Sequence, residues 1–511
     1  MTGVFPDEFL KRLGDRTQSA SVSRLRPCSN ELPIYDLNDA SVRDLLITRS
    51  KPETFQLGTG ASIFTSTLIP AIISAQFEVI LVTCFWAPSA TLTALRDALK
   101  ALAEHRRALI NDAVTRGKPA PPFLTVRICF SSRSFFQKLL HPQSRRGYVY
   151  PPSSWPSKLG LPEPALLEAG KIKLQVKSLF FLPFSVMHPK YIIVDRKRAF
   201  IPSCNISWEP WLEGCVEITG DALKGLLSFF TLTWGDTLEL SCDPASEGAE
   251  NQPPDISQSG PTLVRSTAHW MAVLRNLSAA TLTLVLPSSH HRNPRFRPLP
   301  WQSCPAPPAT PLNAALFQLF ESARESIYVQ TPNLTSQPVV TALLEALERG
   351  VDVTVVANRH MMIFEQLLTA GTITAWSLRS LIRRYGQIKA RFSDSVEFGE
   401  LEAGLSCPGR LRVAYFHSRS HPVDSVYHDE SGAHAVSSSA DSEEPVHSHL
   451  KLMIVDDEYV MLGSGNMDRA SWYTSQELGV LFHSRELVEQ IRGGLNDVLE
   501  GRLNIAFDSD N

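Results

Sequence analysis

The chain has 511 residues, of which 43% are hydrophobic and 20% charged, a composition typical of globular proteins with sizeable cores. Its 49 basic and 52 acidic residues give a formal net charge of −3, which excludes a protein that holds a nucleic acid through an overall positive field. The eight scattered cysteines form no Cys-x-x-Cys pair. This argues against a zinc site and fits a reducing compartment, and we predict neither a metal nor a cofactor.

The first 27 residues lack the apolar core of a secretory signal. Their arginines and serines resemble a mitochondrial transit peptide, whereas three acidic residues among them count against one. The most apolar long stretch, residues 61–86, is interrupted by a proline, a glutamine and a glutamate, so we predict no transmembrane segment and only peripheral membrane contact. The expected location is intracellular, cytoplasmic or peripheral to a membrane, with mitochondrial import left open.

Residues 63–100 and 312–349 share one pattern of predicted elements. Each stretch gives an amphipathic helix, a short strand, a turn of small residues and a second helix. Apolar residues recur at i, i+3 and i+4 in the helices and run continuously in the strands. A further apolar strand follows at residues 124–132 and 351–359. Strands that alternate with helices indicate an α/β protein, and the recurrence of the pattern indicates a duplicated one.

The repeat extends over most of the chain. The residues between the two halves are polar and rich in proline, glycine and serine, which is typical of a linker. Residues 417–447 have no counterpart in the first half, and their polar, serine-rich composition predicts a disordered or lid-like insertion. The predicted organisation is an N-terminal extension (1–49), a first half (50–241), a linker (242–261) and a second half (262–505) that contains this insertion.

Each half contains a histidine and a lysine at the mouth of a strand-like apolar run. They are His188 and Lys190 before the run YIIV, and His449 and Lys451 before the run LMIV. Side chains two residues apart on a strand point to the same face, about 7 Å from one another. Each histidine can therefore act on a ligand together with its own lysine.

An aspartate closes each apolar run, Asp195 in the first half and Asp456 in the second. It follows the lysine by an odd number of residues, which on an ideal strand places it on the opposite face. We therefore expect each aspartate at the strand end or in support of a catalytic histidine. In the second case its carboxylate would fix the tautomer and orientation of the imidazole.

Serine and asparagine follow at matching positions, as Ser203 and Asn205 in one half and as Ser464 and Asn466 in the other. Together with two lysines, these donors form a cradle for an anion without a metal. Two histidines in such a cradle divide the work between a nucleophile, which forms a covalent intermediate, and a general acid and base. The lysines stabilise charge at phosphorus, so the pattern predicts a phosphodiester substrate.

Each of these features alone has an ordinary structural explanation. A single His-x-Lys at a strand start is usually a solvated pair, and a lone Gly-Ser-Gly-Asn is usually a turn. Here histidine, lysine, aspartate, serine and asparagine recur at identical offsets in both halves. Chance does not account for these matches, although duplication alone can preserve structural residues, and we interpret the pattern as catalytic.

The paired pattern resembles the signature of the phospholipase D superfamily, His-x-Lys-x4-Asp-x6-Gly-Ser-x-Asn in two copies. The second copy matches throughout, including Gly463, whereas the first has Pro202 in place of the glycine. Proline lacks a backbone donor, which puts part of the first anion cradle in doubt. The resemblance implies a duplicated bilobal α/β fold, in which two α/β/α sandwich halves are related by a pseudo-twofold axis and share one active site.

The resemblance also implies roles for particular residues. It implies a phosphohistidine intermediate without a metal, with His188 as the nucleophile and His449 as the general acid and base. An acidic residue follows each motif in the family. We assign Glu477 in the second copy and Glu217 in the first to this role as substrate-binding residues, with Glu213 as the alternative in the first copy.

The substrate class is harder to predict, because fold and motif do not determine it. Residues 327–335, IYVQTPNLT, resemble a segment of cardiolipin synthase-like phosphatidyltransferases. We therefore predict a phospholipid phosphodiesterase or phosphatidyltransferase with a phospholipid substrate and a peripheral membrane surface as partners, and leave the oligomeric state open. The alternatives are a metal-independent nuclease, which the net charge disfavours, and a non-catalytic phospholipid-binding scaffold. The basic residues 383–391 fit an anionic lipid surface, a nucleic acid or solvent.

Overall fold

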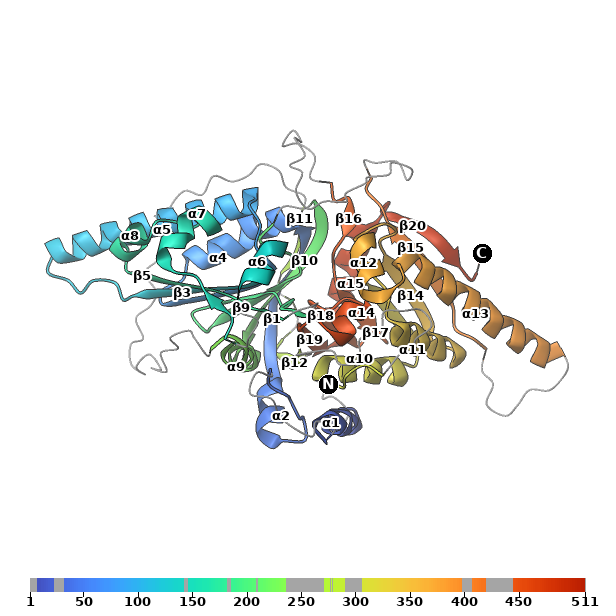
Figure 1. Ribbon diagram of the computed structural model, residues 1–511. Helices are drawn as coiled ribbons and strands as arrows, with labels where there is room; N and C mark the ends of the chain where they lie inside the picture. The colour runs from blue at the N-terminus through green and yellow to red at the C-terminus, as the bar shows by residue number, and fades with distance from the viewer. Residues whose placement is uncertain are drawn as a thin grey trace.

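The computed structural model has two halves that meet along a central seam (Figure 1). It describes residues 7–22, 32–141, 146–181, 185–207, 210–235, 271–275, 277, 279–289, 306–397, 407–419 and 444–510. The predicted linker, 242–261, lies outside these ranges, as do residues 420–443 of the predicted insertion at 417–447.

The first half is built on a mixed sheet whose strands pair in the order β5–β3–β2–β8–β9–β10–β1. The strands β5, β3 and β2 are parallel, and the others are antiparallel to their neighbours. Most of β2 and β3 is buried on both faces, as expected of strands that helices cover. The strands are Ile47–Thr59 (β1), Glu78–Phe85 (β2), Leu124–Ser132 (β3), Ile172–Ser178 (β5), Tyr191–Val194 (β8), Arg198–Pro202 (β9) and Trp211–Gly220 (β10).

The second half repeats this sheet in the order β15–β14–β13–β17–β18–β19–β12, with the same strand directions. Its strands are Thr281–Ser288 (β12), Ser326–Gln330 (β13), Asp352–Ala357 (β14), Leu411–Phe416 (β15), Leu452–Val455 (β17), Tyr459–Gly463 (β18) and Glu477–His483 (β19). The equivalent strands β1 and β12 pair with each other, so the halves share one continuous sheet. The predicted duplicated α/β fold is therefore confirmed.

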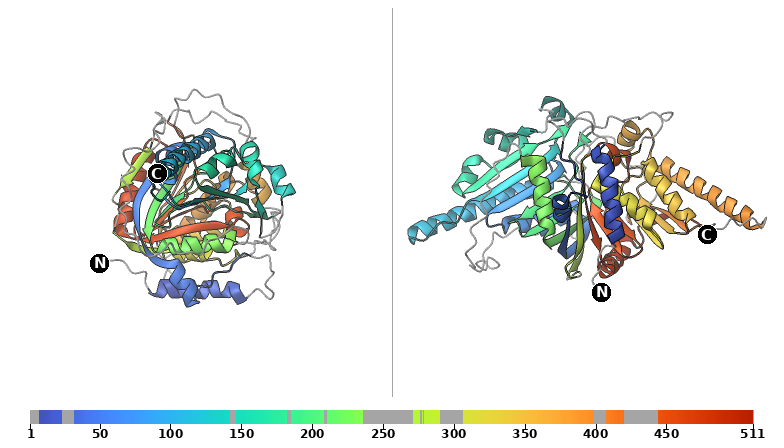
Figure 2. Two further views of the ribbon diagram at one scale, coloured as in Figure 1. Left: turned by 90° about the vertical axis from the view of Figure 1, so that its left-hand side faces the viewer. Right: turned by 90° about the horizontal axis from the view of Figure 1, so that it is seen from below.

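Helices join the strands at equivalent places in the two halves. One helix crosses from β2 to β3 and another from β13 to β14, and one more helix follows each of β10 and β19. Figures 1 and 2 show α5 and α9 on opposite faces of the first sheet. These helices are Ala90–Thr115 (α5), Ala222–Trp234 (α9), Gln337–Glu348 (α11) and Arg485–Leu499 (α15). Within the described ranges, no helix has the length and apolar character needed to cross a bilayer.

The helix expected from residue 63 is interrupted. The chain forms α3 (Gly60–Ile63), a π-helical turn (Phe64–Leu68) and α4 (Ile69–Ile73). Pro70, which has no backbone N–H to donate, directly follows the π-helical turn near the start of α4. The corresponding segment of the second half is the single helix α10 (Pro311–Ser322), which Thr310 caps by accepting a hydrogen bond from the third helical N–H.

The described part of the predicted N-terminal extension forms two helices, α1 (Asp7–Val22) and α2 (Ala40–Leu46). The helix α1 packs against α10 of the second half, where Arg16 pairs with Glu321. The chain then enters the first half through β1. The helices α1 and α2 therefore lie across the two halves, at the bottom of the view in Figure 1.

Candidate active site

The two predicted His-x-Lys motifs lie together at the seam. Lys190 immediately precedes β8 and Lys451 immediately precedes β17, and both strands are fully buried apolar runs. The strands β8 and β17 occupy equivalent places in the two sheets. His188 and His449, which lie just before these strands, approach each other at the seam from opposite halves. The charge of His188 acts on the pKa of His449. The structure thus brings both motifs into one site.

Short parallel bridges between the halves hold the two histidine segments. The N–H of His188 donates to the carbonyl of Gln476 at 3.0 Å, next to a bridge between Met187 and Gln476. On the other side, β16 (His447–Ser448) pairs with the start of β10, and the N–H of His449 donates to the carbonyl of Leu212 at 2.8 Å. The main chain therefore joins each histidine to a strand of the opposite half.

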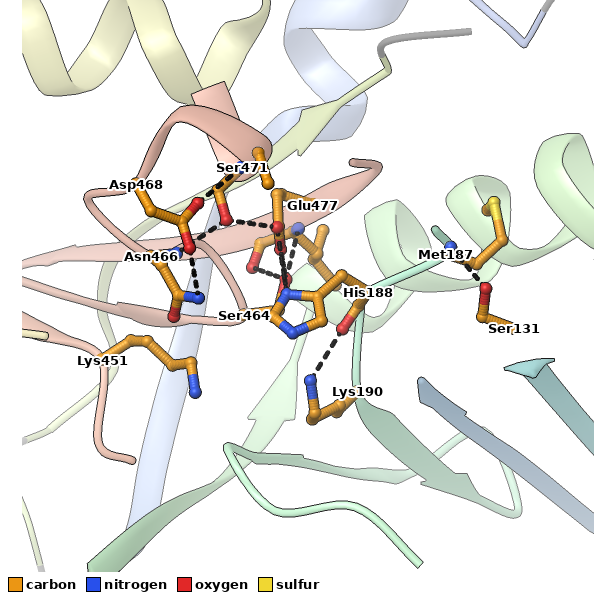
Figure 3. Close-up of polar contacts among 12 residues, drawn as sticks. Ser131, Met187, His188, Lys190, Lys451, Ser464, Asn466, Asp468, Ser471 and Glu477 are labelled. Carbon is orange, nitrogen blue, oxygen red and sulfur yellow. Dashed lines mark hydrogen bonds and ion pairs between the residues drawn. The ribbon is translucent and has the colours of Figure 1, made fainter. Parts of the chain in front are cut away.

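The first histidine–glutamate pair joins His188 to Glu477. Nδ1 of His188 lies 2.9 Å from Oε2 and 3.0 Å from Oε1 of this fully buried glutamate (Figure 3). The hydroxyls of Ser464 and Ser471 donate to the same carboxylate. Burial opposes ionisation, but His188 and these hydrogen bonds hold the pKa of Glu477 below its ordinary value. Burial also lowers the pKa of His188. A neutral His188 that donates Nδ1–H to an ionised Glu477 keeps its lone pair on Nε2.

The second pair has the same geometry, but the pKa of its glutamate is shifted in the opposite direction. Nδ1 of His449 lies 2.8 Å from Oε1 of Glu213, to which the hydroxyl of Ser203 also donates. Burial raises the pKa of Glu213 to about 7, against the opposing effect of Lys451. Burial, followed by Lys451 and Lys190, lowers the pKa of His449 well below its ordinary value. Glu213 is therefore protonated more readily than Glu477.

Lys190 and Lys451 bring two ammonium groups to one space. Nζ of Lys190 donates to the carbonyl of His188 at 3.0 Å, and Nζ of Lys451 donates to the carbonyl of His449 at 2.7 Å. Figure 3 shows both lysine side chains ending beside the His188 ring. Burial, with added repulsion from Lys190, lowers the pKa of Lys451 to about 7. A bound anion would relieve this repulsion and favour the charged lysine.

The structure corrects the predicted role of Ser203 and Ser464 as donors to an anion. Their hydroxyls donate to Glu213 and Glu477. Each serine oxygen also accepts a hydrogen bond from a backbone N–H of the following strand, at 2.9 Å in the first half and 3.0 Å in the second. The two serines therefore hold the glutamates that orient the histidines.

Asn205 and Asn466 differ in their contacts. Oδ1 of Asn205 accepts hydrogen bonds from the N–H of Phe85 at 3.3 Å and the hydroxyl of Thr83 at 3.4 Å. This arrangement leaves Nδ2 of Asn205 to donate to a ligand. Nδ2 of Asn466 instead donates to Asp468 at 3.0 Å, and its buried Oδ1 has no partner among the described residues. Anion binding by these asparagines stays a prediction, which the contacts favour for Asn205.

Glu217, the predicted acidic residue of the first half, does not contact a histidine. Its carboxylate accepts a hydrogen bond from Nε of Arg198 at 2.7 Å and from the hydroxyl of Thr54 at 3.3 Å. The alternative, Glu213, occupies the position beside His449 instead. The assignment of Glu217 is therefore wrong, and Glu213 replaces it.

Strand register explains this error. Glu213 lies two residues before the partner of Pro202 on β10, and Glu477 lies two residues before the partner of Gly463 on β19. Pairing across the sheet thus matches Glu213 to Glu477. Distance along the chain does not match them, because the connection in the second half includes the short helix α14 (Arg469–Tyr473).

Asp195 and Asp456 lie at strand ends, which is the first of their two predicted positions, and their carboxylates hold backbone N–H groups there. Asp195 accepts the N–H groups of residues 76–78 at 2.8–2.9 Å, and Asp456 those of residues 324–326 at 2.8–3.2 Å. Both have positive φ, 51° and 53°, which aspartate tolerates better than most residues. An apolar strand of about 13 Å separates each from its lysine. The aspartates therefore anchor the start of a neighbouring strand.

Three further residues lie near the site. The ring of Trp211 lies 5.0 Å from that of His449, between centroids. Ser471 donates to Glu477 at 2.7 Å, and Asp468, whose pKa burial raises, accepts the N–H of Ser471 at 2.8 Å. No motif marks α14, which carries Ser471. Among the described residues, no group of three or more histidine, cysteine, aspartate or glutamate side chains could hold a metal ion.

A duplicated α/β sheet with a paired His-x-Lys site at its seam is the arrangement expected of the phospholipase D superfamily. Residues 316–498 match the family model described as "Cardiolipin synthase, PLD-like domain". This part of the chain, which contains the second motif, is a phospholipase D-like domain. The resemblance to the superfamily and to its cardiolipin synthase-like members is therefore confirmed.

Several solved structures are similar to the chain. Phosphatidylserine synthase from Haemophilus influenzae Rd KW20 is 14% identical, with 96% of this chain and 92% of that chain covered and a TM-score of 0.49. Polyphosphate kinase from Porphyromonas gingivalis is 12% identical, with coverages of 96% and 55% and a TM-score of 0.41. The phospholipase D family member Nuc from Salmonella typhimurium is 17% identical, with coverages of 44% and 96% and a TM-score of 0.25. No curated protein matches the sequence.

Proposed function

We propose that this protein is a phospholipid phosphodiesterase or phosphatidyltransferase that acts through a phosphohistidine at His188. The observation that carries the proposal is the reciprocal pairing of His188 with Glu477 and of His449 with Glu213 across the seam. Each glutamate fixes the Nδ1–H tautomer of a histidine from the other half, so both Nε2 atoms are left for chemistry. A site that is assembled from both halves in this way binds a single phosphate between two imidazoles.

The opposite pKa shifts of the two glutamates support His188 as the nucleophile. Glu477 accepts hydrogen bonds from His188, Ser464 and Ser471, and its lowered pKa keeps it ionised. An ionised acceptor stabilises the positive charge that His188 gains when Nε2 bonds to phosphorus. The P–O bond to the leaving group breaks as the N–P bond forms, and the nucleophile needs no deprotonation.

The pair of His449 and Glu213 is suited to moving a proton. The pKa of Glu213, raised to about 7, lets this pair hold a proton near neutral pH. The negative charge of a bound phosphate favours protonated His449, because it opposes the repulsion from Lys451 and Lys190. His449 then protonates the leaving alkoxide. In the second step it takes the proton of the incoming alcohol or water, which attacks phosphorus and releases His188.

The lysines supply electrostatic stabilisation. Lys190 and Lys451 are both buried, and both side chains end beside the His188 ring (Figure 3). Ammonium groups held in a site that excludes water stabilise the charge on the equatorial phosphate oxygens more strongly than they could in solvent. Nδ2 of Asn205 is a further donor within the same half as His188. The chain's own residues therefore provide the nucleophile, the proton and the countercharge.

The family match supports phospholipid as the substrate class. The matching model is described as "Cardiolipin synthase, PLD-like domain", and cardiolipin is a phospholipid. The contacts around His188 distinguish neither water nor a particular alcohol as the acceptor. The proposal therefore covers hydrolysis and transfer, which share the first step.

One assay tests the proposal. Purified protein with EDTA is offered phosphatidylcholine, phosphatidylglycerol with ethanol, or a DNA oligonucleotide, alongside the variants His188→Ala and His449→Ala. Phosphatidic acid or phosphatidylethanol that is absent with both variants is the expected result. Cleavage of the oligonucleotide alone would replace the lipid substrate by nucleic acid. Turnover that survives His188→Ala would overturn the role of that histidine.

A further inference from the structure

The helix α12 (Ile363–Ala370) has its polarity reversed relative to an ordinary surface helix. Its one buried side chain is Gln366, whose Nε2 donates to Asn333 at 3.0 Å and whose Oε1 accepts the N–H of Thr374 at 2.7 Å. The side chains of Phe364 and Leu368 are 79% and 55% exposed. Surface helices normally bury their apolar stripe against the core. Here a polar anchor holds the helix while its apolar residues face outward.

Exposed apolar side chains continue on neighbouring elements. Trp376, at the start of α13 (Thr374–Glu397), is 53% exposed. Leu140, at the end of α6 (Phe135–Leu140) in the first half, is 81% exposed. Single exposed apolar residues are common, but a group of them on adjoining helices marks an interaction surface. We call the group the apolar rim: Leu140, Met362, Ile363, Phe364, Leu367, Leu368 and Trp376.

The apolar rim lies beside the catalytic site. Cys84, at the end of β2, is close enough to Lys190 and Glu477 for their charges to act on its thiol, and the charges of Lys138 on α6 and Glu365 on α12 act on it as well. Lys138 and Glu365 also interact electrostatically with each other. In Figure 1, α6 and α12 lie on either side of the seam. The rim therefore borders the site from both halves.

Basic residues accompany the apolar rim. Arg359 and His360 are exposed just before α12. Arg379 and Arg383 are exposed on α13, three and seven residues after Trp376, and thus lie on the same helical face as that ring. The charges of Arg359 and Arg379 both act on Tyr415 of β15. A tryptophan with flanking arginines is typical of a segment at the boundary between lipid headgroups and acyl chains.

We propose that the apolar rim is the surface by which this protein inserts into an anionic phospholipid bilayer. Phe364, Leu368 and Leu140 would enter the acyl region, and Arg359 and Arg379 would contact lipid phosphates. Docking in this way brings the seam to the membrane, so that a headgroup reaches His188 while its acyl chains stay in the bilayer. This inference deepens the proposed function and rests on it for the identity of the substrate, although binding is measured without turnover.

The test is flotation with vesicles of phosphatidylcholine and phosphatidylglycerol, or of phosphatidylcholine alone, using full-length protein that carries His188→Ala to prevent turnover. The double variant Phe364→Ser/Leu368→Ser is compared with Val114→Ser/Phe123→Ser, whose side chains are 72% and 63% exposed and are not part of the rim. We expect the first double variant to weaken vesicle binding at least tenfold and the second to leave it within twofold. Arg359→Gln should weaken binding to the anionic vesicles only.

Two further readouts separate the possible failures. Phe364→Ser/Leu368→Ser with His188 intact should turn over the soluble diester bis(p-nitrophenyl) phosphate at the normal rate, and its melting temperature should be unchanged. A lowered melting temperature would show that the chain itself covers the rim and would overturn the inference, as would vesicle binding that equals that of the control. Vesicle binding through the rim without turnover of any diester would leave the inference standing and refute the proposed function.

Discussion

Nδ1 of His188 lies 2.9 Å from the carboxylate of Glu477, a residue of the opposite half of the duplicated sheet. The reciprocal contact joins His449 to Glu213 at 2.8 Å. Neither half therefore contains a complete histidine–carboxylate pair. The site can therefore form only where the two halves of the duplicated fold pack together. Separating the halves would leave two buried glutamates and two histidines without their partners.

Replacement of Glu477 by glutamine should remove the nucleophile without unfolding the protein. A glutamine amide can donate to Nδ1 of His188 and so move the imidazole proton to Nε2, where it blocks attack on phosphorus. By analogy with the loss of the orienting carboxylate in serine proteases, kcat should fall by about 10²–10⁴-fold. The measurement is steady-state turnover of bis(p-nitrophenyl) phosphate. Glu217→Gln is the matched control, and an equal loss of kcat in both variants would contradict the assignment.

The leaving group should reveal whether His449 is the general acid. A p-nitrophenolate leaves without protonation, whereas an alkoxide requires a proton. His449→Ala and Glu213→Gln should therefore slow the formation of the intermediate much more for an alkyl phosphodiester than for a p-nitrophenyl one. Burst amplitudes with the two substrates measure this difference. Equal losses on both substrates would assign His449 some other role.

Lys451 should destabilise the fold in a way that depends on pH. Burial lowers its pKa to about 7, so above that pH the folded state binds fewer protons than the unfolded state, and stability rises with pH. The penalty is complete below pH 7 and declines as the pH rises toward the ordinary pKa of lysine. Lys451→Met should therefore abolish turnover but raise the free energy of unfolding at pH 6, where the buried charge costs most, and by less at pH 9. Denaturant unfolding at the two pH values is the measurement. A lower stability of the variant at pH 6 would contradict this account.

Asp456 should matter for stability and little for chemistry. Its carboxylate accepts the N–H groups of residues 324–326 at the start of β13. Asp456→Ala leaves these donors without an acceptor and places alanine at φ 53°, so we expect a loss of roughly 1–3 kcal/mol. Asp456→Asn should lose less, because asparagine tolerates positive φ. Turnover per folded molecule should stay within a few-fold of normal, and a loss as large as that of Glu477→Gln would refute the structural role.

The sequence sufficed to predict the fold and the meeting of the two motifs. Periodicity distinguished helices from strands, and the repeat revealed the duplication. Buried runs such as YIIV and LMIV had to be central strands, and His188 and His449 therefore had to stand at corresponding sheet ends. These predictions depended on local patterns and on internal symmetry, both of which are visible in the chain itself.

The predictions that failed depended on contacts between distant segments. For Asp195 and Asp456 the sequence left two alternatives open, the strand end or support of a histidine. The structure shows the strand end, where each carboxylate accepts the N–H groups of an adjacent strand. Glu217 was chosen over Glu213 by distance along the chain, whereas strand pairing selects the acidic residue. The hydroxyls of Ser203 and Ser464 could donate to a bound anion or to a buried glutamate. Only the tertiary structure shows that the partner is the glutamate.

Identification of the phosphorylated residue tests the central claim most directly. The protein is mixed with a phosphodiester substrate, quenched in base within milliseconds and analysed by peptide mass spectrometry under conditions that preserve phosphoramidates. The account predicts that the phosphorus-containing adduct is found on the peptide with His188, is absent from His188→Ala, and persists longer in His449→Ala with a p-nitrophenyl substrate. An adduct on His449, or rapid turnover with no adduct on either histidine, would contradict it.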